Sequence, residues 1–155
     1  MQDTILLDLF THDIGHAQQL LELIDTEFKA LTERDLGHLE KILADKQPLL
    51  ALLDAHGKQR TEALVALGLS ADRTGLHTLA ETSPLGADLI ARSEELSAVL
   101  EQCQNANQRN GRLIRANQAS VGSTLAILRG QDAPSLYDSR GGAAKIQRQR
   151  PLSQA

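Results

Sequence analysis

The chain has 155 residues, of which 41% are apolar, 23% are charged and only 2% are aromatic. Leucine supplies 28 residues and alanine 20, whereas valine supplies three. Because leucine and alanine favour helices while β-branched and aromatic residues favour strands, the composition excludes a β-rich fold and predicts one soluble, all-α domain. No apolar run approaches the roughly 20 residues that cross a bilayer, and Asp3 and Asp8 stand where a signal peptide would need basic residues.

The number of cysteines indicates the cellular compartment, and the distribution of charge limits the classes of partner. The single cysteine, Cys103, excludes an internal disulfide and fits a reducing compartment, so we expect a cytoplasmic protein. Residues 1–128 carry 18 Asp and Glu against 11 Lys and Arg, a balance of −7, whereas residues 129–155 carry two against five, a balance of +3. An acidic body lacks the basic face of a nucleic-acid-binding domain, so no nucleic-acid partner is expected.

A heptad pattern predicts a first long helix that ends near Thr32. Its apolar positions alternate at spacings of four and three residues, which is typical of a helix packed along its length against another helix. They are Phe10, Ile14, Ala17, Leu21, Ile24, Phe28 and Leu31. Asp35 is a good N-cap for a second helix, and the connection is so short that the two helices must be antiparallel neighbours.

The second helix is expected to follow a similar repeat, although its packing face is interrupted. The leucines that define this face are Leu36, Leu39, Leu43, Leu50, Leu53, Leu64 and Leu67. Lys46, Gly57 and Arg60 fall on the same face. Pro48 removes a backbone hydrogen bond and is expected to kink or restart the helix, whereas Gly68 predicts a Schellman-type stop.

A loop with at most one short helical turn is expected over residues 68–83, because this stretch is rich in Gly, Ser, Thr and Asp. Ser83 and Pro84 then form a helix start, with serine as the N-cap and proline at the first helical position. The heptad repeat continues for some 45 residues to Leu128. Residues 130–155, rich in glycine and polar side chains, are expected to form a flexible basic tail.

Asparagines crowd the lower half of this third long helix, and Asn110 and Asn117 fall on its packing face. Buried amides can fix register and the choice of partner at a cost in stability. An equally good account is that this part of the helix is only partly covered in the isolated protein. The sequence alone leaves both accounts open.

The residues that carry catalytic or metal chemistry form no convincing site. His12 and His16 stand four residues apart, but the heptad register predicts both on the solvent face, and no third metal ligand is identifiable. Cys103 lies on the apolar face with no charged neighbour to activate it. His38 resembles a phosphorylatable histidine, although Ile42 stands where a small residue is normal. With no Gly-rich phosphate loop, we expect no enzyme, no metal and no cofactor.

Two segments resemble a known family. The run Asn107-Gln-Arg-Asn110-Gly-Arg-Leu-Ile114 is similar to the N-x-x-N-G-x-L-I segment of FlgN-type flagellar export chaperones, and the Tyr137-centred run 136–141 is similar to the segment after their last helix. The resemblance covers essentially the whole chain. It implies a cytosolic chaperone of the flagellar type III secretion apparatus that binds hook-associated proteins, prevents their premature assembly and delivers them to the export gate.

The sequence therefore predicts an all-α fold, an antiparallel helical hairpin with a long third helix, in a helical chaperone domain (1–129) followed by the tail (130–155). The expected client-binding residues are Asn107, Asn110, Ile114, Asn117 and Val121. Tyr137 is the position that the resemblance matches to export-gate contact. Two alternatives remain at this stage. One is a self-associating structural coiled coil, which would pair Asn110 and Asn117 with themselves in a homo-oligomer. The other is a histidine phosphotransfer domain acting through His38.

Overall fold

Four helices make up the part of the chain that the computed structural model describes, which is the backbone of residues 1–129 and the side chains of residues 1–119. They are α1 (Gln2–Glu33), α2 (Leu36–Ala66), α3 (Arg73–Thr82) and α4 (Gly86–Arg129). The all-α prediction is confirmed. The expected loop over 68–83 is wrong in part, because ten of its residues form α3, which Asp72 caps by accepting a hydrogen bond from the Gly75 backbone N–H at 3.0 Å.

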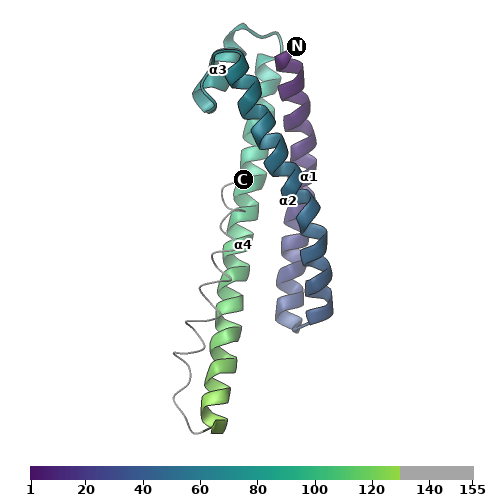
Figure 1. The fold of residues 1–155 in the computed structure, drawn as a ribbon, viewed down its shortest axis with the longest axis vertical. Coiled ribbons are helices and arrows are strands. Elements are labelled where there is room, and N and C mark those ends of the chain that lie inside the picture. Colours follow the sequence, from purple (N-terminus) through teal and green to yellow (C-terminus); the bar gives the residue numbers. More distant parts are fainter. Residues whose placement is uncertain (130–155) are drawn as a thin grey trace.

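The helices form an elongated bundle around α1 (Figure 1). Helices α1 and α2 form the antiparallel hairpin, and α4 packs along the other side of α1. The short α3 packs against α4 near the N-terminal end of α1. Helix α4 is 44 residues long, and its C-terminal end runs past the turn of the hairpin (Figure 1). None of the described helices is both long and apolar enough to cross a membrane.

Local capping explains where the hairpin turns. Arg34 adopts a left-handed conformation (φ 56°) after the last turn of α1, and the Asp35 N–H donates back to the Ala30 carbonyl at 2.9 Å. The Asp35 carboxylate then accepts a hydrogen bond from the His38 N–H at 3.1 Å, as its N-cap role predicts. The stop after α2 is also confirmed, because Gly68 has φ 74° and the Leu69 N–H reaches the Leu64 carbonyl.

The packing face of α2 differs from the leucine pattern. Leu36, Leu43 and Leu67 are exposed, and α2 continues through Pro48 without a restart. The positions that face the bundle are again spaced by four and three residues, and they include Lys46, Leu53 and Arg60 of the predicted face. They are Ile42, Lys46, Leu49, Leu53, His56, Arg60 and Ala63. Three of these seven side chains are polar or basic, and all three contact a carboxylate of α1.

The apolar core is concentrated toward the α3 end of the bundle. All four helices contribute to it, and among the described side chains of α4, which end at residue 119, its last buried apolar member is Ala106. Its fully buried side chains include Leu6, Leu20, Ile24 and Leu89. Burying a leucine-sized side chain contributes about 1.5–3 kcal/mol, so each of these positions is a large stabilising contact. Further along α4, the contacts with α1 become polar.

Two glycines permit close backbone approaches at this end. A Cβ atom on Gly75 would lie 1.8 Å from the Ser70 carbonyl oxygen, and one on Gly86 would lie 2.0 Å from the Ala80 carbonyl oxygen. Neither contact is tolerable for an alanine without backbone movement. These two glycines therefore fix how α3 folds back between α2 and α4.

Candidate functional site

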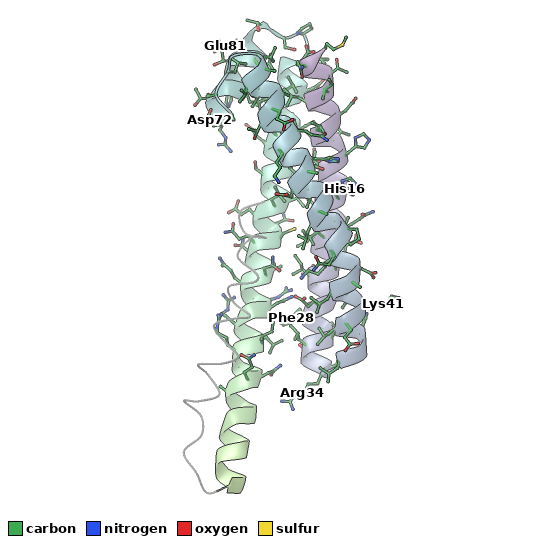
Figure 2. All side chains as sticks on the ribbon, viewed as in Figure 1. His16, Phe28, Arg34, Lys41, Asp72 and Glu81 are labelled. Atoms are coloured by element: carbon green, nitrogen blue, oxygen red, sulfur yellow. The ribbon has the colours of Figure 1, made fainter. Side chains whose placement is uncertain are left out.

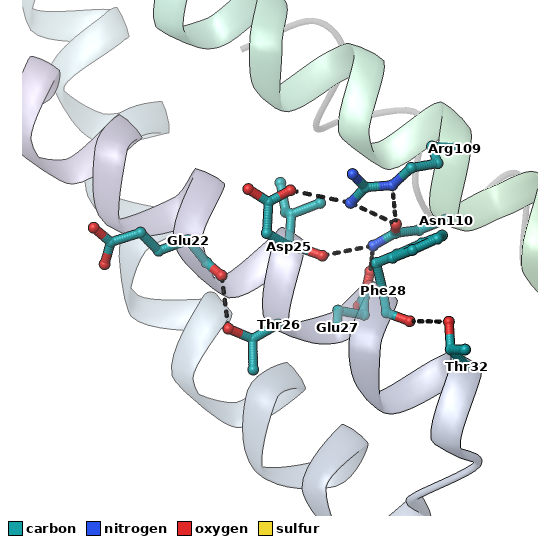
Figure 3. Close-up of polar contacts among 9 residues, drawn as sticks. Glu22, Asp25, Thr26, Glu27, Phe28, Thr32, Arg109 and Asn110 are labelled. Atoms are coloured by element: carbon teal, nitrogen blue, oxygen red, sulfur yellow. Dashed lines mark hydrogen bonds and ion pairs between the residues drawn. The ribbon is translucent and has the colours of Figure 1, made fainter.

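A polar network holds α4 against the hairpin in the asparagine-rich region (Figure 3). The Asn110 side chain is completely buried, and its Nδ2 donates to the Ile24 carbonyl at 2.8 Å and to Glu27 Oε1 at 2.7 Å. The Asn110 Oδ1 accepts two hydrogen bonds from the Arg109 guanidinium, each 3.1 Å long. On the far side of the hairpin, Lys46 Nζ donates to Glu27 Oε2 at 3.1 Å. The network therefore links α4, α1 and α2.

The charges inside this network are buried and paired. Glu27 is 5% exposed and Lys46 is 4% exposed. Withdrawing two charges from water costs several kcal/mol for each ion, and their attraction offsets this cost only when the geometry is good and the remaining hydrogen-bonding sites are filled. Here the second oxygen of Glu27 is filled by Asn110. Because each of these groups needs its own partner, the network favours one register between the helices.

The outer edge of the network is formed by Arg109. Its guanidinium lies 4.2 Å from the centre of the Phe28 ring, which is a cation–π contact, and its Nη2 donates to Asp25 Oδ1 at 3.0 Å. The side chains of Arg109 and Asp25 are 36% and 58% exposed, so their ion pair is screened by solvent. Arg109 thus covers Asn110 from solvent while presenting a cationic edge beside an aromatic ring.

One amide next to the network has an unsatisfied donor. Asn107 is only 8% exposed, and its Nδ2 is the single buried side-chain N or O atom without a hydrogen-bond partner among the described side chains. Leaving such a donor without a partner costs about 1–3 kcal/mol. Asn107 is therefore a local energetic cost on a helix face that other contacts hold in place.

The predicted client-binding residues divide between the interior and the surface of the bundle. Asn107 and Asn110 are buried against the hairpin, whereas Ile114 and Asn117 are half-buried where α4 leaves it. The side chains of Val121 and Tyr137, and the whole of 130–155, lie outside the described residues. Sequence reasoning missed the partners of Asn110, which are Glu27 and Arg109. The one available signal was Lys46, a charge on an otherwise apolar helix face.

Cys103 behaves as the sequence predicts. The thiol is buried, and its Sγ lies 3.4 Å from the Ala17 carbonyl oxygen, to which it donates. Burial raises the pKa of the Cys103 thiol to about 11, with a smaller contribution from the negative charge of Asp25. A thiol with so high a pKa is a poor nucleophile at neutral pH.

The histidines depart from the predicted arrangement. His12 is exposed as expected, but His16 is half-buried, so placing it on the solvent face was wrong. His16 turns toward α2, where His56 lies, and both ring Nδ1 atoms approach the buried carboxylate of Asp13. These three residues are the group of described side chains that could hold a metal ion. His38 is exposed at the start of α2, and Ile42 beside it is buried.

A groove of about 440 Å³ lies between α2, α3 and α4, at the opposite end of the bundle from Asn110. Phe10, Leu64, Leu76 and Leu96 are among the apolar side chains that line it, and Arg73 is among the polar ones. No histidine or cysteine lines the groove. Thr61, Ser93, Ser97 and Asp72 are further polar residues of its lining.

The fold and the site define an elongated helical bundle in which one long helix extends beyond the hairpin that supports it, a form suited to binding another helix. Comparison with known proteins identifies the family. The sequence profile of the FlgN protein family matches residues 1–145. A crystal structure from Pseudomonas aeruginosa, of a protein assigned to flagella synthesis as FlgN, is 54% identical and superposes with a TM-score of 0.68. The match covers 79% of this chain and 94% of that one.

The chain belongs to the FlgN family of flagellar synthesis proteins. A search of curated proteins gave no match. The resemblance drawn from the Asn107–Ile114 segment is thereby confirmed at the level of the family.

Proposed function

We propose that the protein is a cytosolic, non-catalytic flagellar export chaperone. It binds hook-associated proteins, prevents their premature assembly and delivers them to the type III export gate. The observation that carries this proposal is the change in α4 after Ala106. From there to residue 119 no further described apolar side chain joins the buried core, polar groups hold the helix, and the helix then runs past the hairpin (Figure 1). A helix with a partly covered face supports helix-in-groove binding of an amphipathic client segment.

The proposed client-binding face consists of Asn107, Asn110, Ile114, Asn117 and Val121. Their spacings of three and four residues put them on one side of α4. Half-buried Ile114 and Asn117 supply the accessible part of this face, whereas the Asn107 Nδ2 is buried and lacks a partner in the described bundle. Asn110 is already occupied by Glu27 and the Ile24 carbonyl. We therefore assign Asn110 the indirect role of setting the position of α4.

The decisive experiment is isothermal titration of full-length protein with purified hook-associated proteins or their terminal helical fragments. Ile114→Asp should weaken client binding at least tenfold, because a charge on the apolar contact area opposes desolvation. Exposed Ala116 on the same helix provides the control, and Ala116→Asp should bind as the unaltered protein does. Equal affinities for the two variants, with helix content unchanged, would refute this assignment of the client-binding face.

The competing structural role makes a different prediction about the same face. A self-associating coiled coil would cover Ile114 with a second copy of the chain, so Ile114→Asp would dissociate a homo-oligomer. The chaperone role instead predicts that the mass of the free protein is unaffected by this substitution. Light scattering of both forms at several concentrations distinguishes the two roles.

We propose that the tail, 130–155, acts at the export gate through Tyr137. A tyrosine offers a large contact area with only two torsions to order, which suits an anchor in a polar segment. Tyr137→Ala should leave client affinity unchanged and weaken binding to the cytosolic domain of the export gate. Loss of client affinity with retained gate affinity would contradict this role.

A further inference from the structure

A buried carboxylate at the middle of the hairpin gathers basic groups from both helices. Asp13 on α1 is fully buried, and its Oδ2 accepts a hydrogen bond from Arg60 of α2. Its Oδ1 lies 2.6 Å from Nδ1 of His56 and 3.5 Å from Nδ1 of His16. Figure 2 marks His16 on this part of α1. Two histidines from different helices thus each direct their Nδ1 atom at Oδ1 of Asp13.

We propose that Asp13, His16 and His56 form a binding site for a divalent transition-metal ion of the zinc type. One ligand atom from each residue lies within 4.8 Å of the other two. Two imidazole nitrogens and one carboxylate oxygen suit Zn²⁺, Co²⁺ or Ni²⁺, whereas Ca²⁺ and Mg²⁺ prefer sets of oxygen ligands. An ion held here would join α1 to α2.

The two distances from Asp13 Oδ1 to the histidine Nδ1 atoms lie at or below the spacing of a filled site, and the ligand atoms of the two histidines lie within 4.8 Å of each other. Ligand bonds of about 2.0–2.2 Å in tetrahedral geometry put ligand atoms roughly 3.3–3.6 Å apart. The His16 contact already matches this spacing, and the His56 contact needs to lengthen by less than about 1 Å, which a small side-chain rotation supplies. Three protein ligands leave a fourth position for water.

The surroundings support a metal ligand role for Asp13. Metal-binding carboxylates are usually held by a hydrogen bond to their other oxygen, and Arg60 provides this bond to Oδ2. The side chains of His16 and His56 are 26% and 19% exposed, so an ion has a route from solvent. The positive charge of Arg60 opposes a second cation. The fixed geometry of the ligands has to outweigh that repulsion.

The competing interpretation is a purely structural contact between the helices, and His16 distinguishes the two. A structural contact needs Arg60 and His56, which make the short contacts with Asp13. It gains little from His16, whose 3.5 Å contact is long for a hydrogen bond. A three-ligand metal site, by contrast, depends on His16 as much as on His56. His12, exposed one turn earlier on α1, provides a matched control.

The test uses full-length protein without a polyhistidine tag, treated with chelator and titrated with Zn²⁺ by calorimetry and with Co²⁺ by absorption spectroscopy. We expect one ion per chain and a rise in melting temperature on binding, because the ligands come from two helices of the folded state. His16→Ala and His56→Ala should each weaken binding at least tenfold, whereas His12→Ala should leave it unchanged.

Two results would overturn the proposal. One is the absence of stoichiometric Zn²⁺ or Co²⁺ binding by the unaltered protein, which would leave Asp13 as the centre of a structural contact only. The other is unchanged affinity in His16→Ala. Because His16 is half-buried and makes only a long contact, this variant is expected to fold, and circular dichroism checks its helix content. The metal affinity of His16→Ala therefore distinguishes a metal site from a structural contact even if His56→Ala proves unstable.

Discussion

The two ends of the bundle are built on different principles. At the α3 end, side chains such as Leu6, Leu76 and Leu89 from three helices meet in an apolar core. At the hairpin turn end, Glu27 and Asn110 meet inside the interface, and α3 makes no contribution. Apolar contacts are non-directional, so they stabilise the bundle without specifying one alignment. Hydrogen-bonded charges and amides require particular partners, so they specify the alignment and contribute less net stability.

This contrast has a consequence for binding. A helix that is held by polar contacts and extends beyond its support keeps its remaining apolar area available. A helix face that is embedded in a leucine core has no apolar area left for a partner. The anchoring end and the proposed binding end are therefore separated along α4, and substitutions at the two ends should have separable effects.

The largest effect is expected at the apolar end. Leu89→Asp places an unpaired charge at a fully buried position and should reduce the free energy of unfolding by about 4 kcal/mol or more. Urea unfolding followed by circular dichroism measures this loss. The exposed Ala91 on the same helix serves as the control, since Ala91→Asp should change stability by less than about 0.5 kcal/mol. Similar losses in the two variants would mean that this end is not the anchor.

The next effect concerns the buried ion pair. Lys46→Met leaves Glu27 as an uncompensated buried charge and should cost about 3–5 kcal/mol. Replacing both partners, in Glu27→Leu with Lys46→Met, should restore most of that loss because no charge is left buried. Lys58, which pairs with Asp54 on the surface, is the control, and Lys58→Met should have little effect. A double variant less stable than Lys46→Met would show that the pair contributes net stability.

A smaller effect separates two neighbouring asparagines. The first is Asn110→Leu, which should leave the helices intact. The structure adds a cost of about 1–3 kcal/mol, because the substitution removes the hydrogen bonds to Glu27 and to the Ile24 carbonyl. Asn107→Leu removes a donor that has no partner among the described residues and should be neutral or stabilising. Thermal unfolding measures the stability of both variants. A lower melting temperature for Asn107→Leu than for Asn110→Leu would contradict this account.

The smallest effect concerns the chemistry of Cys103. A pKa raised to about 11 keeps the thiol protonated at pH 8, so a thiol reagent such as DTNB should react roughly 100-fold more slowly in the folded than in the unfolded protein. The raised pKa also gives a stability contribution that is complete below the unfolded value of 9.0 and is lost as the pH rises toward 11. Fast labelling of the folded protein would show that this part of α4 opens readily.

The sequence by itself determined the helices and several of their ends. Heptad spacing identified the long helices, and the caps at Asp35 and Gly68 appear where they were expected. These features depend on contacts within a few residues along the chain, so the local sequence is sufficient to specify them. The family also followed from two short segments, Asn107–Ile114 and 136–141.

Tertiary structure decided which residues of each helix meet. The sequence placed Lys46 and Arg60 on the packing face of α2 but did not show what they contact, and it did not place His56 there. In the structure Glu27 and Asp13 of α1 compensate the burial of these three side chains. The spacing of apolar residues along one helix shows which of its residues share a face, but not which residues of another helix they meet. The partner of a buried charge, however, depends on the alignment of two helices, which involves residues 19 to 47 positions apart. For that reason the Asp13–His16–His56 cluster and the partners of Asn110 emerged only from the folded structure.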